Sequence, residues 1–322
     1  PKCFLCKENE GYHGRINHPG RANLRAIPFS MNDEEWFLQY SPYVYYNEHT
    51  IVFKKEHEPM TINEETFKRL LSFVEFLPHY FLGSNADLPI VGGSILAHEH
   101  YQGGNYEFPI ENAEVIKEYS VKGYKVNLQM LKWPLSVIRL RGEKDEVASL
   151  ATHILKSWKS YSDESSNIIC KTTENHNTIT PIARFKDGLY ELDLALRNNR
   201  TSDLIPEGIF HPRKSKHHIK RENIGLIEVM GLAILPARLA NELNLIKKCL
   251  LNEIKIENHP ELDIHLDFYS KLKEENQFTP TNADKLMENV VGNIFTTCLE
   301  DSGVFKQTEE GIKAFQKFIV EL

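Results

Sequence analysis

The sequence has little of what a secreted, membrane-spanning or nucleic-acid-binding protein requires. Its 322 residues include five cysteines, an odd and sparse set that argues against a disulfide framework and favours a reducing cytoplasm. No segment approaches the ~18 uncharged apolar residues of a membrane-spanning helix, and no apolar leader opens the chain. A net charge of −7 disfavours a nucleic-acid partner, whereas a small phosphorylated ligand needs only a local basic site.

The hydrophobic pattern predicts a mixture of strands and helices without a low-complexity linker, and therefore one compact body. Residues 36–56 predict a β-hairpin with its turn at Asn47 and Glu48. Thr61 and Glu64 fit the capping box of a helix that ends near Pro78. Further strands are expected at 125–130, 135–140, 178–184 and 190–197, and further helices at 144–161, 237–256, 261–275, 283–299 and 308–320.

The segment from His98 to Gln102 places two imidazoles and an amide two residues apart. Because side chains alternate across a strand, His98, His100 and Gln102 would share one face and Glu99 would lie on the other. A neutral imidazole can attack activated phosphorus when its other nitrogen is hydrogen-bonded, and an amide can donate to a phosphoryl oxygen. The segment therefore predicts phosphoryl or nucleotidyl transfer through His100; surface histidines on an edge strand are the alternative.

A pair of cysteines near the start predicts a metal site. Cys3 and Cys6 have a spacing that zinc sites use, but two more ligands are needed. We propose His98 as the first of these and His57 as the second. Two ordinary thiols and a solvated His57 are the alternative, which the sequence favours about equally. A redox role is disfavoured because no βαβ pattern surrounds the cysteines.

A basic run at residues 211–221 stands out in this acidic chain. It could bind a sugar phosphate or a diphosphate, and its histidines could hold a second metal, although their spacing is not diagnostic. A solvated loop is the alternative. Close by, Glu228 lies in an apolar stretch, where a carboxylate needs a partner such as a sugar hydroxyl or a structural arginine.

Three blocks of the sequence together resemble the galactose-1-phosphate uridylyltransferases, most closely the branch typical of Gram-positive bacteria: residues 3–6, 92–104 and 210–231. The resemblance implies a ping-pong reaction of galactose metabolism, in which UDP-glucose leaves UMP on a histidine and galactose 1-phosphate then takes it up. It also implies the site residues: His100 as nucleophile, Gln102 supporting the phosphoryl group, Asn85, Ser94 and Glu228 binding substrate, and Cys3, Cys6, His57 and His98 as ligands of a structural zinc.

This family belongs to the histidine-triad superfamily, so the resemblance implies an α+β fold of two similar halves with mainly antiparallel sheet and packed helices. We divide the chain into an N-terminal half, residues 1–124, with the nucleophile, and a C-terminal half, residues 125–322, with a helical tail. The implied protein is a cytoplasmic nucleotidyltransferase that needs neither nucleic acid nor membrane. A homodimer is left open.

The chain departs from the family pattern in three places, one of which is the spacing from Ser94 to His98, longer by one residue. Glu99 stands where the better-known branch has a proline between the two histidines. The family also has substrate-contacting arginines before the cysteine pair, whereas this chain begins at Pro1 without an initiator methionine. We therefore expect that an N-terminal segment is missing.

Two other functions are kept open beside the transferase. One is a sugar-nucleotide phosphorylase or a nucleotide hydrolase of the same superfamily, although its hydrolases typically have a third histidine at the position of Gln102. The other is a zinc-stabilised binding module without catalysis.

Overall fold

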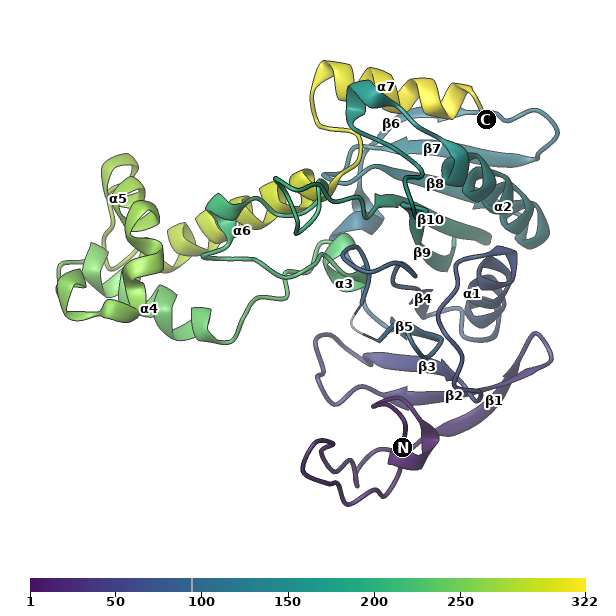
Figure 1. Cartoon of the computed structure of the whole chain (residues 1–322), viewed down its shortest axis with the longest axis horizontal. Helices are drawn as coiled ribbons and strands as arrows, with labels where there is room; N and C mark the ends of the chain where they lie inside the picture. The colour runs from purple at the N-terminus through teal and green to yellow at the C-terminus, as the bar shows by residue number, and fades with distance from the viewer. Residues whose placement is uncertain (94) are drawn as a thin grey trace.

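The computed structural model describes residues 1–93 and 95–322, and its centre is a single ten-stranded sheet (Figure 1). Paired strands run antiparallel, in the order β1-β2-β3-β5-β4-β9-β10-β8-β7-β6. The predicted class, α+β with antiparallel sheet and a helical C-terminal region, is confirmed. The strands are β1 (Ile27–Met31), β2 (Glu34–Tyr40), β3 (Thr50–Lys54), β4 (Phe81–Gly83), β5 (His100–Gly104), β6 (Val115–Tyr119), β7 (Val126–Leu131), β8 (Val137–Gly142), β9 (Asn177–Lys186) and β10 (Leu189–Asn198).

The helices match the regions expected from periodicity, with shifted ends. They are α1 (Glu64–Phe76), α2 (Lys144–Ser160), α3 (Leu226–Val229), α4 (Arg238–Leu250), α5 (Leu266–Glu275), α6 (Ala283–Ser302) and α7 (Glu309–Val320). The short helix α3 was not expected. Within the described residues, no helix is long and apolar enough to cross a membrane.

Two layers cover the sheet. Helices α1 and α2 contact each other and the central strands, and with α7 they enclose the largest hydrophobic cluster (Figure 1). A second cluster joins strand residues to α3 and to the C-terminal part of α6. Helices α4 and α5 and the start of α6 form an arm that projects from the sheet and has a small core of its own (Figure 1).

The strands and helices fall into two sets in the chain. Strands β1 to β5 with α1 precede strands β6 to β10 with α2, and the β4–β9 pair joins them, with Leu82 opposite Ala183. The division after residue 124 stays a prediction. It lies between β6 and β7, which pair with each other.

The predicted hairpin forms, and a turn does occur at Asn47 and Glu48, where the backbone N–H of His49 donates to the carbonyl of Tyr46 (3.2 Å), but the strand before it ends earlier than expected. Strands β2 and β3 pair with Tyr40 opposite Thr50, so residues 41–49 form a loop and do not extend the strand. The backbone N–H of Ser41 donates to the carbonyl of His49 (2.8 Å) and closes this loop. Within it Val44 and Glu48 have positive φ angles (47° and 54°), which an extended strand does not allow.

Helix α1 begins as expected, but with a different pair of capping residues. The side chain of Asn63 accepts from the backbone N–H of Thr66 (3.1 Å), and the Thr66 hydroxyl accepts from the backbone N–H of Asn63 (3.2 Å). The pairing expected between Thr61 and Glu64 is therefore wrong, because the helix starts two residues later than a cap at Thr61 requires. The predicted apolar face is buried at Phe67, Leu70, Leu71 and Val74.

Glu99, between the two histidines, faces the α1 side of the sheet. It is 4% exposed, and its Oε1 accepts from Arg69 Nη1 of α1 (3.0 Å) and from the Tyr101 hydroxyl (3.0 Å). Burial raises the pKa of Glu99, and the charge of Arg69 opposes that shift. The Arg69 guanidinium also lies over the ring of Trp36 (5.4 Å) and pairs with Glu34. These contacts attach α1 to the strand that contains the histidine segment.

We predict that Glu99→Ala lowers the free energy of unfolding by about 3 kcal/mol, because it removes one partner of a buried ion pair. Denaturant titration measures this loss. The matched control is Glu35→Ala, which removes the partner of Lys55 in an exposed ion pair, and it should leave stability almost unchanged. Equal losses in the two variants would contradict a structural role for the buried pair.

Candidate functional site

Strand β5 places His100 and Gln102 on the side of the sheet away from α1. Tyr101 between them belongs to the core on the α1 side, where its ring stacks on Trp36 (5.1 Å between centroids). His100 and Gln102 instead line a cavity of about 550 Å³, together with the predicted Asn85 and Glu228. The alternation of β5 places two of these residues, and the cavity brings together four of those singled out from the sequence.

His100 has the hydrogen bonding that a nucleophile requires. Its ring is 6% exposed, and Nδ1 lies 2.8 Å from the carbonyl oxygen of His98. Because a carbonyl only accepts, Nδ1 holds the proton and donates it, and Nε2 keeps its lone pair. Burial lowers the pKa of His100 to about 4, so the ring is neutral at pH 7. A neutral imidazole with a free nitrogen at a cavity wall can attack an electrophile.

The first residue of α3, Leu226, packs closely against the end of β4 because that strand ends in a glycine. Gly83 pairs with Gln102, and a Cβ at Gly83 would lie 2.8 Å from Leu226 Cδ1. Asn85, just beyond β4, accepts from the backbone N–H of Leu226 (2.8 Å) through its Oδ1. Gly93 also lies close to Asn85: a Cβ at Gly93 would be 2.7 Å from Asn85 Nδ2, so the amide of Asn85 would have to shift.

Glu228 is buried at the edge of the same cavity. Its Oε2 accepts from the backbone N–H of Gly225 (3.0 Å), and its Oε1 lies 2.7 Å from Lys220 Nζ. Burial raises the pKa of Glu228, and the charge of Lys220 lowers it. The sequence left open whether Glu228 pairs with a structural arginine. In the structure its charged partner is a lysine of the basic run, Lys220.

The four side chains expected to hold a metal lie together. Ligand atoms of Cys3, Cys6, His57 and His98 are all within 4.8 Å of one another. Cys3 Sγ is 3.3 Å from His98 Nδ1 and 3.6 Å from Cys6 Sγ, and Cys6 Sγ is 3.2 Å from His57 Nδ1. Ligands at ~2.0–2.3 Å in a tetrahedron around zinc are ~3.3–3.8 Å apart. This group could therefore bind a metal ion and is compatible with zinc.

The second nitrogen of His98 supports the same conclusion. His98 Nε2 lies 2.8 Å from the carbonyl oxygen of Lys54 and must donate to it, which leaves Nδ1 as a lone pair facing the two thiols. His98 thus directs its ring at the cysteine pair and, unlike His100 and Gln102, does not line the cavity. Among the described residues this is the one group of three or more such ligands, so the histidines of the basic run do not form a second.

Ser94, the remaining predicted substrate contact, lies outside the described residues.

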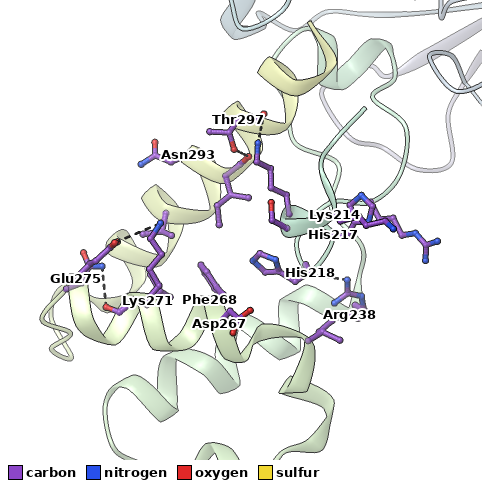
Figure 2. Close-up of a pocket in the computed structure, with 18 of the residues that line it drawn as sticks. Lys214, His217, His218, Arg238, Asp267, Phe268, Lys271, Glu275, Asn293 and Thr297 are labelled. Atoms are coloured by element: carbon purple, nitrogen blue, oxygen red, sulfur yellow. Dashed lines mark hydrogen bonds and ion pairs between the residues drawn. The ribbon is translucent and has the colours of Figure 1, made fainter. Parts of the chain in front are cut away.

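A larger cavity, of about 1280 Å³, lies between the basic run and helices α5 and α6 (Figure 2). Several of its charges already have partners within the protein. Lys216 contacts Asp301 (2.6 Å), and Lys271 lies 3.9 Å from Glu275. None of the residues predicted for catalysis lines this cavity. The size of this cavity alone therefore does not make it the active site. Part of the basic run forms ion pairs within the protein, as Lys216 does with Asp301.

Sequence reasoning missed His49, which lines the cavity beside Gln102. Its Nε2 lies 3.2 Å from Gln102 Oε1. Ile51 is opposite Gln102 in the β3–β5 pair, so His49, two residues earlier on the same face, is the diagonal neighbour of Gln102. No local signal marks this residue, because the contact depends on the register of two strands that are far apart in the sequence.

Comparison with known proteins agrees with the resemblance seen in the sequence. A family model described as galactose-1-phosphate uridyl transferase, N-terminal domain, matches residues 1–59, and the C-terminal domain model matches residues 73–264. Proteins named galactose-1-phosphate uridylyltransferase from Clostridium acetobutylicum, Halalkalibacterium halodurans and Bacillus subtilis are 55%, 52% and 52% identical to it, over 99%, 100% and 100% of this chain.

The alignments cover 65%, 65% and 64% of those relatives, so the chain spans about two thirds of their length. A solved DUF4931 family protein from Bacillus cereus has a TM-score of 0.35 and 15% identity, over 57% of this chain and 86% of that one, and adds nothing to the assignment. The two family models and the identity along nearly the whole sequence establish that the chain belongs to the galactose-1-phosphate uridyl transferase family.

Proposed function

We propose that this protein transfers a uridylyl group from UDP-glucose to galactose 1-phosphate through a covalent uridylyl-histidine at His100. The observation that carries the proposal is the hydrogen bond from His100 Nδ1 to the His98 carbonyl, which leaves Nε2 as a neutral nucleophile at the cavity wall. The names of the relatives support the uridylyl group as the group transferred and galactose 1-phosphate as a substrate.

Two displacements at phosphorus make up the reaction. His100 Nε2 forms a bond to the α-phosphorus of UDP-glucose, and the bond to the bridging oxygen breaks, so glucose 1-phosphate leaves with that electron pair. The imidazolium that forms is stabilised by the Nδ1–H bond to the His98 carbonyl. A phosphate oxygen of galactose 1-phosphate then attacks the same phosphorus, the N–P bond breaks, and neutral His100 is restored.

The other predicted residues take supporting roles in this proposal. Gln102 donates from its amide to a non-bridging phosphoryl oxygen, where negative charge grows in the transition state. Asn85 and Ser94 contact the phosphate region of the substrate. Glu228 accepts hydrogen bonds from hydroxyl groups of the sugar, and the charge of Lys220 opposes the rise in the pKa of Glu228 that burial causes.

We further propose that the ion held by Cys3, Cys6, His57 and His98 is zinc, because two thiolates and two imidazoles suit that metal. Its contribution is structural: it would connect the N-terminal segment to the residue before β5. These thiols fit a reducing cytoplasm, where we place the reaction. A homodimer stays a prediction.

We predict that UDP-glucose, supplied without an acceptor, adds one UMP to His100. Intact-mass and peptide mass spectrometry measure the adduct, and glucose 1-phosphate should appear in a burst and then stop. His100→Asn should give no adduct, because an amide nitrogen is not a nucleophile. His259→Asn, in the loop between α4 and α5, is the matched control and should react as the unaltered chain does.

Each other outcome identifies a different function. Continuous release of glucose 1-phosphate would favour a hydrolase. A folded protein that binds the sugar nucleotide without an adduct would exclude the covalent mechanism. A protein that binds no sugar nucleotide in calorimetry would favour the binding module.

We predict about one zinc ion per chain in the purified protein, measured by elemental mass spectrometry. Cys3→Ser should lower this content and the thermal midpoint, because metal binding contributes to folding. Cys170→Ser is the control, since this free thiol lies outside the four-ligand group. Full occupancy in Cys3→Ser would refute the ligand set, whatever the activity of the variant.

A further inference from the structure

The loop of residues 41–49 brings a second histidine to the candidate site. His49 ends this loop, is 4% exposed, and lines the same cavity as His100 and Gln102. Its ring packs between two loop tyrosines, 4.4 Å from the ring of Tyr46 and 5.6 Å from that of Tyr45. These contacts fix the plane of the imidazole, so its two nitrogens have defined neighbours.

The proton of this imidazole can be assigned from the backbone. The N–H of Tyr45 lies 3.5 Å from His49 Nδ1, and a backbone N–H can only donate. Nδ1 is therefore the acceptor, and the proton of the neutral ring is on Nε2. Burial lowers the pKa of His49, which keeps the ring neutral at pH 7. The Nε2–H then donates to the side chain of Gln102, 3.2 Å away.

This assignment fixes the orientation of the Gln102 amide. A donor at Nε2 requires the oxygen of Gln102, and not its nitrogen, to face His49. Among the residues that the structure describes, His49 makes the one hydrogen bond to this side chain. The amide NH₂ of Gln102 is thereby left to face the cavity. A flipped amide would instead present its oxygen to an anionic phosphoryl group and repel it.

We propose that His49 is a positioning residue, which orients the Gln102 amide so that its N–H groups meet the phosphoryl group transferred to His100. The inference rests on the proposed function, and it assigns a task to a residue that touches neither the nucleophile nor the metal group. The order of hydrogen bonds is from Tyr45 N–H to His49 Nδ1, and from His49 Nε2–H to Gln102 Oε1.

The test measures single-turnover formation of the UMP adduct over a range of UDP-glucose concentrations. His49→Phe keeps a flat ring between the tyrosines but has no N–H. We expect the rate at saturation to fall ~10-fold, as for loss of one hydrogen bond to a charged group. The concentration for half-maximal rate should change less than ~2-fold, because the interaction strengthens in the transition state.

Two further variants separate positioning from a general structural effect. His49→Gln restores an N–H donor to Gln102 and should recover most of the lost rate. In a Gln102→Ala background, His49→Phe should slow the reaction by no more than ~2-fold, since there is no amide left to orient. Thermal unfolding of each variant shows that it is folded.

The proposal is overturned by any of three results: a rate for His49→Phe within ~2-fold of the unaltered chain, an equal loss in the Gln102→Ala background, or no recovery in His49→Gln. Each leaves the proposed function standing, provided that the unaltered chain forms the adduct. Failure of the unaltered chain to form it overturns the proposed function, and the role of His49 with it.

Discussion

One residue, His98, connects the Cys3, Cys6 and His57 group, which could bind a metal, to His100, the proposed nucleophile. Its ring points Nδ1 at the two cysteines, its Nε2 donates to the Lys54 carbonyl of β3, and its own carbonyl accepts from His100 Nδ1. The ring and the carbonyl belong to the same residue. A shift of His98 would therefore change its contacts with the cysteine pair and with the Lys54 carbonyl, and also the hydrogen bond that sets the tautomer of His100. In the proposed reaction, an ion bound by this group would therefore affect the orientation of His100 without taking part in any bond that forms or breaks.

Contacts on the opposite face of the histidine segment hold it in its register in the sheet. Glu99 and Tyr101 alternate with His98, His100 and Gln102, and they contact Arg69 and Trp36 on the α1 side. A slip of one residue in β5 would bury His100 against α1 and expose the Glu99 carboxylate. The buried ion pair is thus an obstacle to the wrong register, in addition to any stability that it contributes.

Features that depend on neighbouring residues could be predicted from the sequence. The helical period located α1 and α2, and strand alternation correctly put His100 and Gln102 on one face. Contacts between distant segments could not be predicted. The pairs Arg69–Glu99, Lys220–Glu228 and His49–Gln102 each depend on how separate elements pack. The four expected metal ligands were named from a cysteine spacing and a resemblance. The structure adds the distances between their ligand atoms, which are compatible with one metal site.

The groups around the cavity also bear on the choice between transfer and hydrolysis. Water needs a general base to attack a uridylyl-histidine, whereas the phosphate of galactose 1-phosphate, with a second pKa of ~6, is already an anion at pH 7. Among the described lining residues, His49 has both nitrogens in hydrogen bonds, and Glu228 contacts Lys220 and the Gly225 N–H. Gln102 is not basic. In the proposed reaction, where His100 itself carries the uridylyl group, these contacts of His49 and Glu228 disfavour activation of water and favour an acceptor that brings its own anionic oxygen.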